Sequence, residues 1–231
     1  MMANKQITTW ANHVRLICLM YSLPDPLLLL QQKPMPKLTW KTLVLSRVTL
    51  YHEKQMRLKA QANWKLCYLN VQTLGLSGKP HPVLRNVLTT REVVKLRAHL
   101  KLLTGDFLSH ELLSRERGSS PRCRICPSDT ESTQHIISEC SATSDTRQRL
   151  YPELLNLIAS IQPGSHLLYN NTPPNILTQF ILDPTSLNLS NGFRISPLHP
   201  RVNELFSFSR DWCYAITNHR NRLLKALKES S

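Results

Sequence analysis

Glycine and aromatic residues are scarce in this chain: 6 of its 231 residues are glycine, and 6% are Phe, Trp or Tyr. Leucine and basic residues are abundant instead, and the apolar residues recur at helical spacing in several segments. A hydrophobic content of 41% is sufficient for a buried core in a chain of this length. These features predict a mainly α-helical, globular protein without a large sheet.

The chain also lacks the uninterrupted run of about 20 apolar residues that a membrane span needs. The segment Val14–Leu30 comes nearest to such a run, but Pro24, Asp25 and Pro26 interrupt it. We therefore expect no membrane segment, no secretion, and an intracellular location, nuclear or cytoplasmic.

Acidic residues are in the minority, with 15 Asp and Glu against 29 Lys and Arg and a formal net charge of +14. Residues 1–118 hold 18 basic and 6 acidic residues, whereas residues 119–231 hold 11 and 9. Because phosphate neutralisation is the commonest use of such an excess, the charge predicts a nucleic-acid partner, RNA or DNA, that meets the first half. The alternative is a basic surface that contacts only water.

Proline-rich and polar breaks divide the chain into four predicted regions. Residues 1–38 hold a helix and a Pro-punctuated linker, and residues 39–118 form a basic helical region. Residues 119–145 form a small cysteine-rich module, and residues 146–231 form a C-terminal helical region. The predicted architecture is therefore a set of helical segments around one small module.

The basic region begins with a long predicted helix from Trp40 to about Lys65, which Thr39 can cap. Its inward face is predicted to hold Trp40, Leu43, Val44, Val48 and Tyr51. A second stripe along the same helix consists of Arg47, Lys54, Arg57 and Lys65. This stripe is either a track for phosphates or a solvated helix face.

Three further helices are predicted from apolar periodicity. One runs from Thr90 to Thr104, with Gly105 as its C-cap and with Val93, Leu96, Leu100 and Leu103 facing inward. A second follows Cys140, and Pro152 either kinks or restarts it. The last runs from about Pro200 to Leu227 and is the clearest amphipathic helix in the chain.

Three of the six cysteines cluster with one histidine in the segment CRICPSDTESTQHIISEC. The pattern C-x2-C-x8-H-x4-C predicts that Cys123, Cys126, His135 and Cys140 bind one structural Zn²⁺ ion in a closed tetrahedral site. His135 and Cys140 are five residues apart, roughly 140° around an ideal helix, so Cys140 has to lie beyond the end of the helical turn that holds His135. Beside this site, Arg122 and Arg124 are expected to orient a bound nucleic acid.

Two alternatives to a metal site remain open from the sequence. A disulfide would leave an odd cysteine in the cluster, and nothing else in the sequence indicates secretion. Chance clustering of buried cysteines is the other alternative, although Asp129, Glu131 and Ser132 make the segment polar. The remaining cysteines, Cys18, Cys67 and Cys213, stand alone in apolar surroundings and are expected to be small buried side chains.

Five segments together resemble a known family. They are LPDPLLLLQQKPMPKLTWKTLVLSRVTLYHEKQMR, LRAHLKLLTGDF, SPRCRICPSDTESTQHIISECSATSDTR, FILDPTSLNL and SRDWCYAITNHRNRLL. In this order they resemble the C-terminal region of the pol protein of non-LTR (LINE-like) retrotransposons, over roughly Leu23 to Leu227. The resemblance implies a thumb-like helical segment and a CCHC zinc module that help to hold template RNA or target DNA. It assigns the zinc ligands to Cys123, Cys126, His135 and Cys140.

The chain departs from this family in its catalytic residues. A reverse transcriptase needs a paired-aspartate signature of the F/Y-x-D-D kind to hold two Mg²⁺ ions. The six Asp residues of this chain are isolated from one another, and the endonuclease of such elements is absent as well. We therefore expect a non-catalytic fragment with no small-molecule substrate, and with nucleic acid and a reverse transcriptase core as its candidate partners.

Three functions follow as hypotheses. The first is a zinc-stabilised module that binds nucleic acid. The second is a protein-interaction scaffold, in which the final helix and the leucines at Leu27–Leu30 dock onto a polymerase core. The third is a host enzyme that uses its histidines, although they show no pairing with a nucleophile at recognisable spacing.

Overall fold

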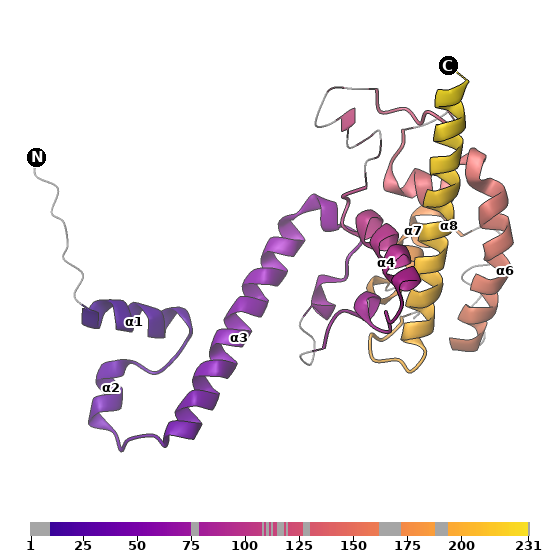
Figure 1. The fold of residues 1–231 in the computed structure, drawn as a ribbon. Helices are drawn as coiled ribbons and strands as arrows, with labels where there is room; N and C mark the ends of the chain where they lie inside the picture. The colour runs from indigo at the N-terminus through magenta and orange to yellow at the C-terminus, as the bar shows by residue number, and fades with distance from the viewer. Residues whose placement is uncertain are drawn as a thin grey trace, which may run out of the picture. The chain divides into compact units, whose positions relative to one another are not determined.

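The computed structural model describes residues 10–74, 79–107, 109, 111, 113–114, 118, 120–126, 130–161, 172–187 and 194–230. These residues are mainly α-helical, which confirms the predicted fold class. They include no strand, and an isolated antiparallel bridge joins Arg122 to Thr130. The chain divides into two compact units, Met1–Ala60 and Gln61–Ser231 (Figure 1). The predicted boundaries at residues 118 and 145 both lie inside the second unit.

The first unit consists of α1 (Trp10–Met20), α2 (Pro26–Gln31) and most of α3 (Lys37–Ala62). The helix α2 was not anticipated from the sequence. It begins because the Asp25 side chain accepts a hydrogen bond from the Leu27 N–H (2.9 Å) and because Pro26 fits the first helical turn. Asp25 and Pro26, which interrupt the apolar run in the sequence, therefore also start the helix α2.

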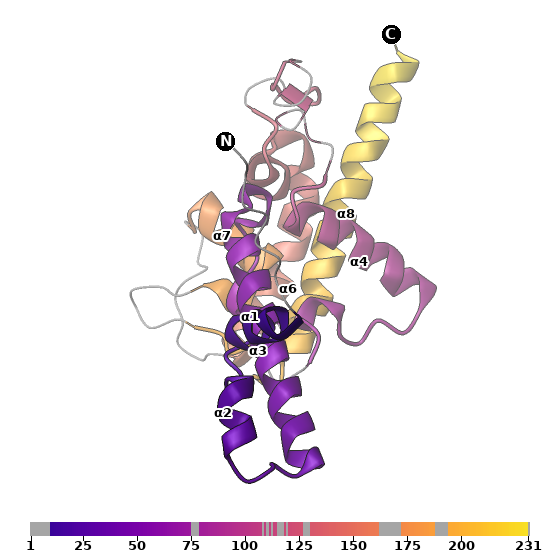
Figure 2. The same cartoon turned by 90° about the vertical axis from the view of Figure 1, so that its left-hand side faces the viewer.

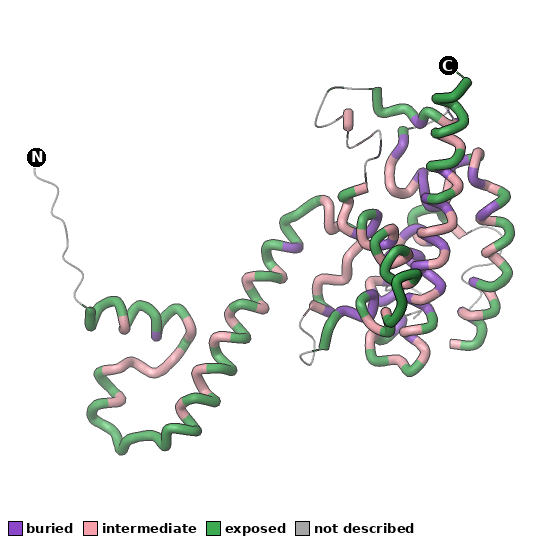
Figure 3. The backbone as a smooth tube through the Cα atoms, viewed as in Figure 1, coloured by how far each residue is buried: buried purple, intermediate pink, exposed green. Residues whose placement is uncertain are grey.

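Few side chains are buried in the first unit. Among its described residues only Cys18 and Ala60 are buried, and most of its length is exposed in Figure 3. The ring of Tyr21 packs edge-on against Tyr51 with 5.0 Å between centroids, and the Tyr21 hydroxyl lies 3.2 Å from His52 Nε2. Large apolar side chains remain at the surface, and Leu30 is 83% exposed.

The second unit is built around α8 (Val202–Glu229), against which α4, α6 and α7 pack (Figures 1 and 2). The side chains of Leu205, Phe206, Trp212 and Ile216 on α8 are fully buried, in agreement with the predicted amphipathic face. The other helices and turns of the unit are η1 (Trp64–Leu66), η2 (Val71–Thr73), η4 (Pro82–Leu84), α4 (Thr90–Leu103), η5 (His135–Glu139), η6 (Ser141–Thr143), α6 (Ser144–Ile161), α7 (Pro174–Leu182) and η7 (Pro184–Ser186).

Asp183, a fully buried carboxylate, ties several short segments of the second unit to α7. Its Oδ2 accepts hydrogen bonds from the Asn70 N–H (2.8 Å) and from His81 (3.2 Å), and its Oδ1 accepts from the Thr185 hydroxyl (2.6 Å). The Val83 N–H donates to His81 Nδ1, so His81 Nε2 carries the proton that faces Asp183. This His–Asp pair therefore serves packing, because both ring nitrogens are already engaged.

Several predicted boundaries need correction. The helix α3 begins at Lys37 and not after a Thr39 cap, because the Trp40 N–H already donates to Pro36 O (3.0 Å). It ends at Ala62, where the Asn63 side chain accepts from the Lys65 N–H and starts η1, so Lys65 lies outside it. The predicted inward face of α3 is only half-buried.

Other predictions in the second unit had mixed outcomes. The helix α4 has nearly its predicted bounds, but Val93 is exposed, and Cys67 is exposed instead of buried. Pro152 lies on the exposed side of α6 without ending it. The short helix α7 was not predicted. The sequence also predicts a short helix around Asp106 to Arg117, and most of these residues lie outside those that the structure describes. No helix of the described residues is long and apolar enough to cross a membrane.

Gly105 ends α4 as predicted. Its φ of +64° lies in the left-handed region that glycine adopts without steric cost. A Cβ atom at this position would also lie 2.9 Å from the backbone oxygen of Lys65. Both the dihedral angle and the close approach therefore require glycine.

His99 makes the stability of the second unit depend on pH. Its side chain is fully buried, its Nε2 donates to Leu182 O (2.7 Å), and no described residue pairs with its Nδ1. Burial lowers the pKa of His99 from its ordinary value to about 4. Between about pH 6.5 and 4 the unfolded chain binds a proton that the folded chain does not, so the free energy of unfolding falls as pH falls, by up to about 3 kcal/mol.

We expect His99→Gln to flatten this dependence when urea unfolding is measured at pH 7, 6 and 5. The exposed His13 provides the matched control, and His13→Gln should leave the slope of the wild-type protein unchanged. Equal slopes for the wild-type protein and His99→Gln would contradict the assignment.

Candidate metal centre and nucleic-acid interface

Cys123, Cys126, His135 and Cys140 come together as the sequence predicted. Their donor atoms all lie within 4.8 Å of one another, and all four side chains are buried. Cys126 Sγ lies 3.1 Å from His135 Nε2 and 3.3 Å from Cys140 Sγ. Two sulfurs that share a tetrahedral zinc ion are about 3.8 Å apart, so a small adjustment lets these atoms surround one ion. All six cysteines of the chain are free thiols, which excludes the disulfide alternative.

The local backbone explains how the loop presents these four side chains. The Arg122–Thr130 bridge pairs the two sides of the loop that carries Cys123 and Cys126. Ser132 starts the turn that holds His135, since its Oγ accepts from the His135 N–H (3.0 Å). This turn, η5, has π-helical geometry, and Cys140 follows it with φ −55° and ψ 114°. The prediction that Cys140 lies beyond the helical turn is confirmed.

The pKa values of the buried thiols are raised, so the cluster favours a bound cation that stabilises the thiolates. Burial raises the pKa of Cys123, and burial together with the neighbouring Cys126 raises the pKa of Cys140 to about 12. Metal binding requires thiolates, and a divalent cation stabilises them strongly enough to release the protons. The donor set of three sulfurs and one imidazole fits a soft or borderline cation, and one that fills all four positions leaves no site for a reacting water.

A buried ion pair joins the cluster to α8. Arg220 Nε and Nη2 donate to the two carboxylate oxygens of Glu131 at 2.9 Å each, and Glu131 is fully buried. Glu131 Oε1 is also 3.6 Å from Cys123 Sγ, and the Arg220 guanidinium lies over the Phe107 ring. Arg220 therefore neutralises the carboxylate beside the thiols and fixes the loop on the helix.

This ion pair was not predicted from the sequence. Arg220 occupies the same face of α8 as the apolar residues Cys213 and Ile216, and a lone charge on an apolar stripe indicates a buried partner. The partner itself is 89 positions away in the sequence, and no spacing rule points to it.

The other nitrogen of the His135 ring, Nδ1, is buried and has no hydrogen-bond partner among the described residues. In metal sites this second nitrogen usually donates to a carboxylate, a carbonyl or a water molecule. Here Nε2 is the nitrogen that faces the three sulfurs, so Nε2 is the atom that can bind an ion.

The six predicted nucleic-acid contacts differ in their surroundings. Arg47 and Lys54 on α3 are exposed and form no ion pair within the described residues. Arg57 pairs with Glu53 (3.9 Å), and Lys65, which belongs to the second unit, pairs with Asp106 (3.8 Å). Arg122 and Arg124 are exposed beside the metal ligands. The predicted stripe on one helix therefore keeps three of its four members, of which two lack a carboxylate partner.

A second basic surface lies on α4, and the sequence analysis did not identify it. Arg91, Arg97 and Lys101 are exposed, and no described acidic residue pairs with them. The charged residues on the inner side of α4 are paired, since Lys95 contacts Glu92 and Asp211. The helix α4 thus separates paired charges next to α8 from surface cations that no described acidic residue pairs with, and this division depends on the packing against α8.

No protein-family model, no curated protein and no solved structure matches this chain. The arrangement itself offers a closed set of four metal ligands and two exposed groups of cations on α3 and α4. Such a metal centre stabilises a fold, and such cations can bind phosphates.

Proposed function

We propose that this chain is a non-catalytic, zinc-stabilised module that binds nucleic acid. The observation that carries the proposal is the buried Cys₃His cluster, held on α8 by Glu131, with Arg122 and Arg124 exposed beside it. Zinc is the proposed ion because three thiolates and one imidazole form a common structural zinc site. The ion would hold the loop in place and take no part in a reaction.

The proposed partner is RNA or DNA, bound through phosphates. Exposed cations without acidic partners lose little when they bind a phosphate and release counterions to the solvent. Arg47 and Lys54 on α3 and Arg97 and Lys101 on α4 have this character, whereas Arg57 and Lys65 would have to leave their carboxylate partners. The resemblance to the C-terminal region of a LINE-like pol protein supports the same assignment, with an intracellular site of action.

Replacing Arg47, Lys54, Arg97 and Lys101 with Gln tests the phosphate contacts. If each cation contacts one phosphate, the slope of log affinity against log salt on duplex DNA should fall by about 3 to 4. Glutamine has a helix propensity close to that of Lys and Arg, so α3 and α4 should persist. Fluorescence anisotropy with a labelled duplex over a series of salt concentrations provides the slope.

Lys225→Gln with Lys228→Gln is the matched control, since both lysines are exposed near the end of α8. This variant removes charge from the less basic half and should change the slope little. An unchanged slope in a folded variant with all four substitutions would remove these contacts from the proposal.

A second function is favoured by the apolar surface of the first unit, where Trp10, Leu30 and Leu38 are 79%, 83% and 76% exposed. This surface supports a scaffold that docks onto another protein, such as a polymerase core. Salt distinguishes the two functions, because phosphate binding weakens steeply as salt rises, whereas apolar docking does not.

A further inference from the structure

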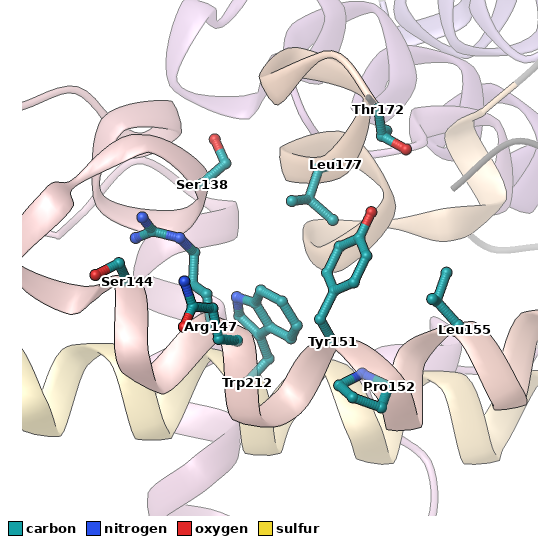
Figure 4. Close-up of a pocket in the computed structure, with 10 residues that line it drawn as sticks. Ser138, Ser144, Arg147, Tyr151, Pro152, Leu155, Thr172, Leu177 and Trp212 are labelled. Atoms are coloured by element: carbon teal, nitrogen blue, oxygen red, sulfur yellow. The ribbon is translucent and has the colours of Figure 1, made fainter. Parts of the chain in front are cut away.

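An open pocket of about 660 Å³ lies on the second unit between the metal cluster and the start of α7 (Figure 4). Its walls come from η5 and α6, which are close in the sequence, and from α7 and α8, which follow later in the chain. This volume is in the range of small-molecule sites. The sequence analysis did not anticipate a pocket here.

The polar lining selects for a negatively charged ligand. Arg147 on α6 is the only charged residue among the ten that line the pocket, and no carboxylate lies among them. Its Nη1 donates to Thr143 Oγ1 (2.8 Å), while no described residue accepts from its Nε or Nη2. The fork of the guanidinium can therefore receive one phosphate group.

Two aromatic side chains supply the apolar part. Tyr151 and Trp212 face the same space as Arg147 in Figure 4, and Leu155 and Leu177 complete the wall. Trp212 is fully buried beneath this wall, and a planar ring can pack against the half-buried Tyr151. The pocket thus joins an aromatic surface and one cation within a single cavity.

Trp212 provides an independent sign of a missing partner. Its side chain is fully buried, yet its indole N–H has no acceptor among the described residues. An unpaired buried donor destabilises a fold, which is a reason to expect an acceptor at this place.

The metal cluster holds one side of the pocket in place. Cys140 is followed directly by η6 and then by α6, which carries Ser144 and Arg147. Ser138, in the turn before Cys140, also lines the pocket and hydrogen-bonds to Thr178 on α7 (3.0 Å). The position of Arg147 therefore depends on the four metal ligands.

We propose that this pocket binds one nucleotide unit, with its base against Tyr151 and its phosphate on Arg147. The unit is either a free mononucleotide or an unstacked nucleotide of a single strand. The inference rests on the proposed function, because a protein that binds nucleic acid meets nucleotides as its natural ligands. It extends that function, because the cations of α3 and α4 recognise only the phosphate backbone, whereas the pocket receives a base.

Calorimetric titration of the zinc-loaded full chain with adenosine 5′-monophosphate tests the site. Adenosine and inorganic phosphate are titrated in parallel, because each carries only one half of the recognised chemistry. We expect saturable binding of the nucleotide at least fivefold tighter than that of either half. Binding of the nucleotide no tighter than both halves would overturn the proposal.

Two variants assign the binding to the pocket. Arg147→Gln should weaken nucleotide binding at least fivefold, whereas Arg149→Gln, an exposed neighbour on α6 that does not line the pocket, should stay within twofold. Ser144→Glu places a carboxylate in the pocket, so it should weaken the binding of a negatively charged nucleotide. The variant should still fold, because a negative charge at the start of α6 stabilises the helix. Unchanged binding in both pocket variants would overturn the site.

A parallel titration with a single-stranded adenosine pentanucleotide distinguishes a nucleotide within a strand from a free mononucleotide. Tighter binding of the pentanucleotide with the same Arg147 dependence identifies a strand, and equal binding identifies a free nucleotide. Nucleotide binding in a chain that shows no salt-dependent affinity for longer nucleic acid would contradict the proposed function and support the pocket. Salt-dependent binding without nucleotide binding would overturn the pocket alone.

Discussion

Replacing Cys126 with Ser is expected to abolish stoichiometric zinc binding and to destabilise the second unit. Cys126 Sγ lies 3.1 Å from His135 Nε2 and 3.3 Å from Cys140 Sγ, so its loss opens the four-ligand set. Structural zinc contributes about 10–16 kcal/mol of binding free energy in small zinc peptides. The hydrophobic core around α8 contains none of the four ligands, and we therefore expect a smaller loss, with a fall of about 10 °C or more in Tm.

Elemental analysis and thermal unfolding measure the two effects. The wild-type chain should contain one zinc ion, and Cys126→Ser should contain less than about a tenth of an equivalent. Cys67→Ser is the matched control, since Cys67 is an exposed thiol outside the cluster, and it should keep both its zinc and its Tm. A wild-type chain without zinc, or a Cys126→Ser variant with one ion per chain, would contradict the assignment.

The Glu131–Arg220 pair is expected to give the second large effect. Arg220→Met leaves a carboxylate buried next to the thiols without its cation, and Glu131→Leu leaves a buried guanidinium without its anion. Each single substitution should lower the free energy of unfolding by about 3–5 kcal/mol. The double variant Glu131→Leu/Arg220→Met should lose much less than the sum, because no uncompensated charge remains.

Chemical denaturation of the two single variants and the double variant measures this coupling. Arg201→Met is the control, since Arg201 pairs with Glu204 on the same helix at an exposed position, and its substitution should change little. Additive losses in the double variant would show that Glu131 and Arg220 act independently, against the geometry.

Local patterns in the sequence were sufficient for much of this structure. The metal ligands lie within 18 residues, so their spacing defines the loop without help from the rest of the chain. The amphipathic face of α8 and the glycine that ends α4 are equally local signals. The caps were harder to predict, since Asn63 ends α3 three residues before the predicted boundary and places Lys65 in the next element.

The features that depend on distant segments could not be predicted in this way. Glu131 and Arg220 meet only because the metal loop lies on α8, and the pocket at Arg147 forms where η5, α6, α7 and α8 converge. The positions of these charged and aromatic residues along the helices follow from the sequence. Tertiary packing decides which residues they contact. The paired and unpaired sides of α4 were likewise distinguishable only with α8 in place.

The binding of zinc-loaded full chain to labelled single-stranded RNA, followed by fluorescence anisotropy between 50 and 200 mM salt, tests the proposed function most directly. Three to seven phosphate contacts predict a fall in affinity of about 10- to 1,000-fold over this range. Removal of the ion with a chelator should weaken the binding further, because Arg122 and Arg124 lie on the metal loop. Affinity that is absent at 50 mM salt, or unchanged at 200 mM salt, would contradict a zinc-stabilised module that binds nucleic acid.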